Sequence, residues 1–69
     1  MVRSKTWLTE SGAVIETRHE LDGFYEAWEV TGETYYRGPR GLVRRVSSQF
    51  EDDVKEYVNE RYGGIVLEL

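Results

Sequence analysis

Glycine recurs at short intervals through the first half of the chain and divides it into segments of strand length. Ser11-Gly12, Asp22-Gly23 and Thr31-Gly32 each follow a β-rich run. Because Gly tolerates the positive φ of a tight turn, such pairs between β-rich runs predict hairpins. We therefore expect antiparallel strands at about 3–10, 13–21, 24–30 and 33–37, with 42–46 as a candidate fifth strand.

Two-residue loops at the three turns give one consistent register. Leu8 then lies opposite Ile15, and Trp28 lies between Thr17 and Tyr35. A shift of one residue at any turn would divide the apolar side chains between the two faces of the sheet. This agreement predicts a meander with one buried face, formed by Val2, Leu8, Ile15, Leu21, Phe24, Trp28, Val30 and Tyr35.

The second half of the chain predicts a helix and a final strand. Ser48 followed three residues later by Glu51 is the pattern of an N-terminal capping box, and Gly63-Gly64 supplies a C-cap. Ile65–Leu69 is apolar enough to join a sheet edge. The apolar stripe of the helix would be Phe50, Val54, Tyr57 and Val58.

The expected architecture is one α+β domain over residues 1–69. It consists of an antiparallel β-meander of four to five strands, one amphipathic helix packed on one face, and a short C-terminal strand. A chain of 69 residues supports only a thin core, so a second domain is not expected.

Composition argues against most enzymatic chemistry. The absence of cysteine excludes disulfides and thiol nucleophiles, and no run of carboxylates has the spacing of a calcium loop. The expected register places His19, the one histidine, between Ser4 and Glu26, a row that three neighbouring strands form by chance. We therefore expect no enzyme, no cofactor, no metal and no small-molecule substrate.

The chain also lacks the marks of a membrane or secreted protein. No apolar run approaches the roughly 20 residues that span a bilayer, and the N-terminus has no signal-peptide apolar region. We expect a cytoplasmic protein without a membrane partner.

Acidic side chains are the most distinctive surface feature. The expected register puts Glu16 directly opposite Glu29 on the polar face, which is unfavourable unless a partner neutralises the pair. Such charges would suit a Lys/Arg-lined groove, although they also aid solubility. The candidate acidic contacts are Glu16, Glu20, Glu29, Asp52, Asp53, Glu56 and Glu60.

Three aromatic side chains are expected on the same polar face, namely Trp7, Tyr25 and Tyr36. Trp and Tyr are frequent anchors at binding interfaces. Alternatively, the terminal strand or residues 42–46 cover this face, and the aromatic rings form a second small core.

A segment rich in arginine offers a different interpretation. Residues 37–45 contain Arg37, Arg40, Arg44 and Arg45 and no acidic residue. Arginines beside exposed tyrosines can hold phosphates and stack on bases. The net charge of −4 argues against this role, because nucleic-acid-binding domains are usually basic.

This profile of a tiny, acidic, cysteine-free α+β domain with a charged binding face resembles the anti-CRISPR proteins of phages. The resemblance extends over the whole chain but includes no shared motif, so no residue role is transferred. It implies a non-enzymatic inhibitor or adaptor in the bacterial host cytoplasm, whose carboxylates mimic DNA phosphates on a CRISPR effector or another nucleoprotein complex. The alternatives are a nucleic-acid-binding module that uses the arginines, and an oligomerising structural protein that pairs through Ile65–Leu69.

Overall fold

The computed structural model describes residues 3–31 and 41–69. These residues form one antiparallel sheet of five strands and one helix, so the expected α+β class is confirmed. The elements in chain order are β1 (Arg3–Thr9), β2 (Val14–His19), β3 (Tyr25–Thr31), β4 (Gly41–Ser48), α1 (Glu51–Tyr62) and β5 (Ile65–Glu68).

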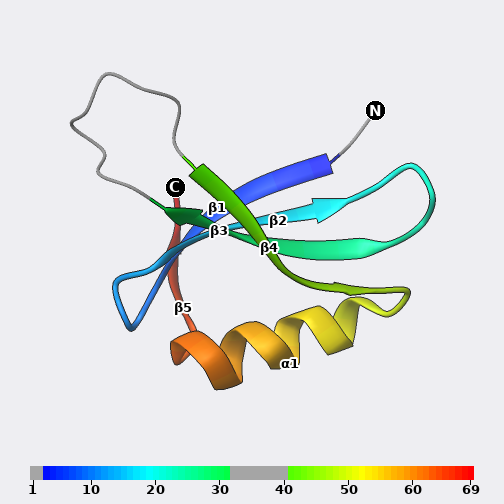
Figure 1. Ribbon diagram of the computed structural model, residues 1–69. Coiled ribbons are helices and arrows are strands. Elements are labelled where there is room, and N and C mark those ends of the chain that lie inside the picture. The colour runs from blue at the N-terminus through cyan, green and yellow to red at the C-terminus, as the bar shows by residue number, and fades with distance from the viewer. Residues whose placement is uncertain (1–2, 32–40) are drawn as a thin grey trace.

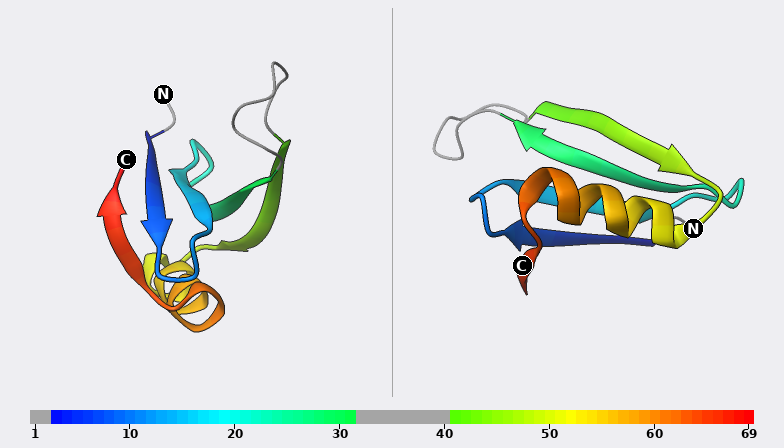
Figure 2. Two further views of the ribbon diagram at one scale, coloured as in Figure 1. Left: turned by 90° about the vertical axis from the view of Figure 1, so that its left-hand side faces the viewer. Right: turned by 90° about the horizontal axis from the view of Figure 1, so that it is seen from below.

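The strands lie in the order β4-β3-β2-β1-β5, with α1 on one face of the sheet (Figures 1 and 2). The final strand joins the free edge of β1, as expected for residues 65–69. At the other edge, β4 pairs directly with β3, and Trp28 lies opposite Arg44. The expected pairing of Trp28 with Tyr35 is therefore wrong, because β4 occupies that edge; residues 33–37 lie outside the described ranges.

The first hairpin turns through three residues, one more than expected. The amide of Thr9 donates to the carbonyl of Ala13 at 3.0 Å, and the amide of Gly12 donates to the carbonyl of Thr9 at 2.9 Å. Gly12 has φ 86°. This is the three-residue hairpin in which a glycine in the left-handed region ends the turn.

The second hairpin repeats this geometry. The amide of Glu20 donates to the carbonyl of Phe24 at 2.8 Å, that of Gly23 donates to Glu20 at 3.0 Å, and Gly23 has φ 90°. The extra loop residue shifts both registers by one position. Thr17 accordingly lies opposite Ala27 and not Trp28.

The shifted register divides the apolar set that was expected on one face. The buried core consists of Ile15, Ala27, Val54, Val58 and Tyr62. Of the expected core residues within the described ranges, Ile15 alone belongs to it, and Leu21 is 78 % exposed. The others are half-buried: Phe24 just before β3, and Leu8, Trp28 and Val30 on the face without the helix. Val2 and Tyr35 lie outside the described residues.

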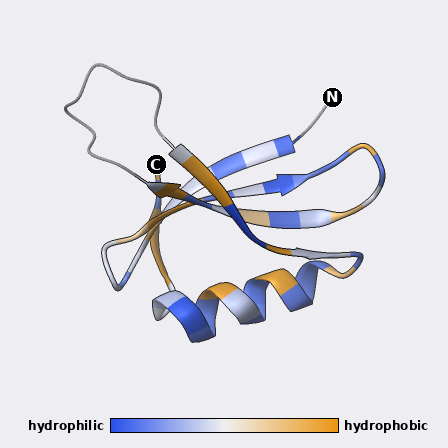
Figure 3. Ribbon diagram, in the orientation of Figure 1, coloured by the Kyte–Doolittle hydropathy of each residue, from blue (hydrophilic) through white to orange (hydrophobic). Residues whose placement is uncertain are grey.

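The helix-free face carries an apolar row across all five strands. Figure 3 colours the end of β3, the start of β4 and much of β5 as apolar. The row consists of Leu67, Leu8, Val14, Val30 and Leu42. The sheet therefore has apolar side chains on both faces, and only one face is covered by α1.

The helix begins without the expected capping box. Phe50 is the N-cap residue, has no side-chain capping bond and is 66 % exposed, so it is not part of the buried stripe. Ser48 instead accepts a hydrogen bond from the Phe50 amide at 3.1 Å and donates one to Asp53 at 2.7 Å. At the other end the C-cap is confirmed, because Gly63 has φ 83° and its amide donates to the Asn59 carbonyl.

The position of α1 leaves part of the sheet open. The helix packs on β3, β4 and β5, and its buried side chains are Val54, Val58 and Tyr62. The first half of β1 and the end of β2 consequently form one wall of a cleft beside the first half of α1.

Substitutions at Ile15 and Leu21 test this packing. We expect Ile15→Val to lower the free energy of unfolding by about 1 kcal/mol, since it removes a methylene from a closely packed site. Leu21→Ala should change it by less than about 0.5 kcal/mol, because this side chain is exposed. Urea denaturation measures both values, and a larger loss for Leu21→Ala than for Ile15→Val would contradict the register.

Candidate functional site

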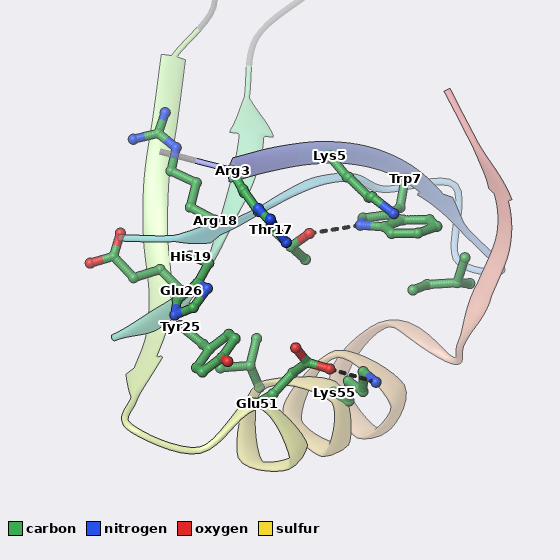
Figure 4. Close-up of a pocket in the computed structure, with 12 residues that line it drawn as sticks. Arg3, Lys5, Trp7, Thr17, Arg18, His19, Tyr25, Glu26, Glu51 and Lys55 are labelled. Carbon is green, nitrogen blue, oxygen red and sulfur yellow. Dashed lines mark hydrogen bonds and ion pairs between the residues drawn. The ribbon is translucent and has the colours of Figure 1, made fainter. Parts of the chain in front are cut away.

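The cleft beside α1 has a volume of about 390 Å³. Alternation along the strands points the odd-numbered side chains of β1, β2 and β3 toward the helix side of the sheet. The cross-strand row of Arg3, His19 and Tyr25 therefore lines this cleft, and Lys5 and Thr17 lie in the next row. Arg18 and Glu26 border the cleft but point away from it (Figure 4).

Trp7 forms one aromatic wall of the cleft. Its indole Nε1 donates a hydrogen bond to the hydroxyl of Thr17 at 2.8 Å, which fixes the orientation of the ring. The ammonium of Lys5 lies 5.8 Å from the ring centroid, within the range of a cation–π contact. The half-buried indole thus presents an apolar surface next to a positive charge.

His19 and Tyr25 form a second aromatic wall. Their rings stack with centroids 4.1 Å apart and an angle of 8° between the planes. The expected row of Ser4, His19 and Glu26 is wrong, because the shifted register places Ser4 opposite Arg18. His19 therefore belongs to an aromatic surface, and its cross-strand neighbours are Arg3 and Tyr25.

The helix contributes an ion pair to the mouth of the cleft. Lys55 Nζ lies 2.8 Å from Glu51 Oε1, and both side chains are more than half exposed. The hydrogen bond from Lys55 lowers the pKa of Glu51, and the same contact raises the pKa of Lys55. Both groups are charged at neutral pH, and the pair leaves Lys55 accessible from the cleft (Figure 4).

The expected opposition of Glu16 and Glu29 is wrong. Glu16 lies opposite Trp28, and Glu29 lies opposite Ile15, so the two carboxylates are on different faces of the sheet. Glu16 accepts a hydrogen bond from Arg18 at 2.8 Å. The one-residue shift therefore separates the two carboxylates, and Glu16 has Arg18 of its own strand as its partner.

Glu29 has a structural environment of its own. It accepts hydrogen bonds from Arg45 at 3.1 Å and from the Tyr62 hydroxyl at 2.9 Å. The contact with Glu29 raises the pKa of Arg45. Burial and the bond to Glu29 together raise the pKa of Tyr62.

Glu26 is a buried carboxylate that the sequence analysis did not single out as a site residue. It is 7 % exposed, accepts a hydrogen bond from Trp28 Nε1 at 2.9 Å and pairs with Arg44 at 3.3 Å. Arg18 stacks over the Trp28 ring at 4.5 Å. Desolvation and then the nearby Glu26 charge raise the pKa of Glu20. Only the correct register would have shown that these groups share one face.

The arginines of β4 are divided between the two faces of the sheet. Arg44 pairs with Glu26 and Arg45 pairs with Glu29, so each arginine neutralises one carboxylate of the neighbouring strand β3. Arg37 and Arg40 lie outside the described residues. In the structure, Arg44 and Arg45 therefore offset the negative charge of carboxylates on β3.

The outer face of α1 has a different charge pattern. Asp52, Glu56 and Glu60 are exposed and form no ion pair with any residue in ranges 3–31 and 41–69. Asp53, on the same helix, accepts a hydrogen bond from Ser48. We define the acidic helix face as Asp52, Glu56 and Glu60.

The structure brings two of the three expected aromatic anchors together, but on the helix side of the sheet. Trp7 and Tyr25 both line the cleft, and Tyr36 lies outside the described residues. The sequence analysis missed the cations beside them, namely Arg3, Lys5 and Lys55. Alternation of Arg3, Lys5 and Trp7 was the available signal.

Comparison of the chain with protein-family models, curated proteins and solved structures found no match. Within the described residues, α1 is too short and polar to be a membrane span. No three His, Asp or Glu side chains of that part of the chain gather as metal ligands.

Tyr62→Phe tests the structural role of Glu29. At pH 7 we expect the free energy of unfolding to fall by about 1.5–3 kcal/mol, because the variant loses a hydrogen bond to a charged acceptor. The raised pKa of Tyr62 means that its contribution is fully present below about pH 10 and is lost as the pH rises through the raised value. The difference between wild type and variant should therefore shrink above that pH.

Urea denaturation at pH 7 and above pH 10 measures this difference. Tyr57→Phe is the matched control, because Tyr57 is half-buried in the same helix. Equal losses in the two variants, or a difference independent of pH, would contradict the Tyr62–Glu29 hydrogen bond.

Proposed function

We propose that this protein is a non-enzymatic binding protein whose acidic helix face docks onto a basic surface of a nucleic-acid-handling protein. One observation carries the proposal. Glu16, Glu26 and Glu29 on the sheet are each paired with an arginine, whereas the acidic helix face has no such partner among the described residues. Three carboxylates without an ion pair to a described residue therefore lie together on one exposed face of α1.

The energetics of α1 support a role beyond folding. Asp52, Glu56 and Glu60 follow one another at intervals of four residues, and like charges at that spacing destabilise a helix. Glu60 also lies near the C-terminal end of α1, where the helix dipole favours positive charge. A basic partner would convert this cost into binding energy.

The proposed partner has a groove lined by Lys and Arg that otherwise holds a phosphate backbone. The acidic helix face presents carboxylates about 6 Å apart along the helix axis. Exposed charges are screened within about 8–10 Å at 0.1–0.15 M salt, so association should weaken steeply as salt rises. A CRISPR effector, as in the anti-CRISPR resemblance, is the narrower form of this proposal.

Charge-neutral variants of the helix test the proposal. We expect Glu56→Gln/Glu60→Gln to lose most partner recovery from nuclease-treated bacterial lysate at low salt, with the free energy of unfolding unchanged or raised by about 0.3 kcal/mol. Glu10→Gln/Glu68→Gln is the matched control, because it removes two exposed carboxylates elsewhere. Mass spectrometry quantifies the recovered proteins.

Two results would contradict the proposal. One is equal recovery of partner proteins by the two double variants, because any loss relative to the wild type would then follow from net charge and not from the acidic helix face. The other is recovery that disappears after nuclease treatment, which would favour nucleic acid as the ligand.

Self-association is a second candidate, favoured by the composition of β5. This strand lies at a sheet edge, and Ile65, Val66 and Leu67 are 45 %, 56 % and 45 % exposed. An exposed apolar edge strand is a template for pairing with another chain.

Val66→Lys tests self-association. If β5 pairs with a second copy, the wild type elutes as an oligomer and the variant as a monomer, because a charge on an edge strand opposes pairing. Light scattering after size-exclusion chromatography measures the mass. A monomeric wild type would contradict this candidate.

A further inference from the structure

The cleft beside α1 concentrates positive charge in a chain whose net charge is −4. Arg3 and Lys5 form no ion pair with a described residue, and Lys55 pairs with Glu51 alone. The cations come from two elements, β1 and α1, that face each other across the cleft. This convergence suits an anionic ligand held between them.

The same cleft offers two aromatic surfaces. The Trp7 ring is held by Thr17, and the His19–Tyr25 stack is held by ring contact at 4.1 Å. Both are half-buried, so a flat ligand would cover apolar area without first ordering the side chains. Stacking of bases on aromatic side chains is a main source of affinity in proteins that bind single strands.

We infer that the cleft binds a nucleotide unit, with its base against Trp7 or the His19–Tyr25 stack and its phosphate at Arg3, Lys5 and Lys55. Its volume of about 390 Å³ lies within the range of small-ligand sites. A free mononucleotide and one unit of a single strand share this chemistry. The site is separate from the acidic helix face and does not depend on the function proposed for it.

A variant of Glu51 tests the inference by a gain of affinity, whereas removal of a cation tests it only by a loss. Its carboxylate lies 2.8 Å from Lys55 at the mouth of the cleft, where it competes with a phosphate. Glu51→Gln should therefore tighten nucleotide binding. Glu56→Gln, on the outer face of the same helix, should leave binding unchanged.

The experiment is an NMR titration of the full chain with AMP, adenosine, inorganic phosphate and the oligonucleotide d(T)8. The two indole N–H signals are assigned with Trp7→Phe. Trp7 reports on the cleft, and Trp28 is an internal control because its indole donates to Glu26 on the other face of the sheet. We expect AMP to shift the Trp7 signal saturably and to leave Trp28 unchanged.

The variants and probes then decide the inference. Arg3→Ala/Lys5→Ala should weaken AMP binding by more than about tenfold, because the loss of one of the two charge-assisted contacts alone would give about tenfold, while Arg61→Ala should have no effect. Adenosine and phosphate should each bind more weakly than AMP. Tighter binding of d(T)8 than of AMP would identify a single strand as the source, and the reverse order would identify a free nucleotide.

Three results would overturn the inference. They are no saturable shift of Trp7 with AMP or d(T)8, phosphate binding as tightly as AMP, and weaker or unchanged binding in Glu51→Gln. Glu56→Gln/Glu60→Gln should bind AMP as the wild type does. A result that contradicts the proposal for the acidic helix face can therefore be distinguished from one that contradicts nucleotide binding in the cleft.

Discussion

Two glycine-terminated turns set which side chains of β1, β2 and β3 face the helix. Gly12 and Gly23 have φ 86° and 90°, which residues with a side chain rarely adopt, and each ends a three-residue loop. Loop length determines which strand positions pair, and a shift of one residue exchanges the two faces. The placement of Ile15 under α1 follows from these loops, as does that of Trp28 on the opposite face.

The same register distributes the charges. It places Glu16 and Glu29 on different faces; Glu16 pairs with Arg18 of its own strand, and Arg44 and Arg45 of β4 pair with acids of β3. Among the described residues, charges without an ion pair gather on the outer face of α1, where they are negative, and in the cleft, where Arg3 and Lys5 are positive. Because α1 separates them, one small acidic domain presents two surfaces of opposite character, and the two proposed ligands are chemically different.

Much of the fold could be predicted from local patterns, whereas the register and the site could not. Three early strand segments, the helix, the Gly63 cap and the terminal strand followed from periodicity and glycine placement. An X-Gly pair marks the end of a turn but fits loops of two or three residues equally well. The cleft depends on that register and on where α1 lies across the sheet, so the alternation of Arg3, Lys5 and Trp7 could not by itself reveal the site.

The most direct test of this account is the cross-strand α-proton NOE pattern between β2 and β3. The three-residue turn predicts an NOE between the α-protons of Thr17 and Ala27, which lie opposite each other. An NOE between the α-protons of Arg18 and Ala27 would instead demonstrate a two-residue turn, in which these two residues form a non-hydrogen-bonded pair with closely spaced α-protons. That result would return Glu16 to the position opposite Glu29 and would contradict the core, the ion pairs and the cleft together.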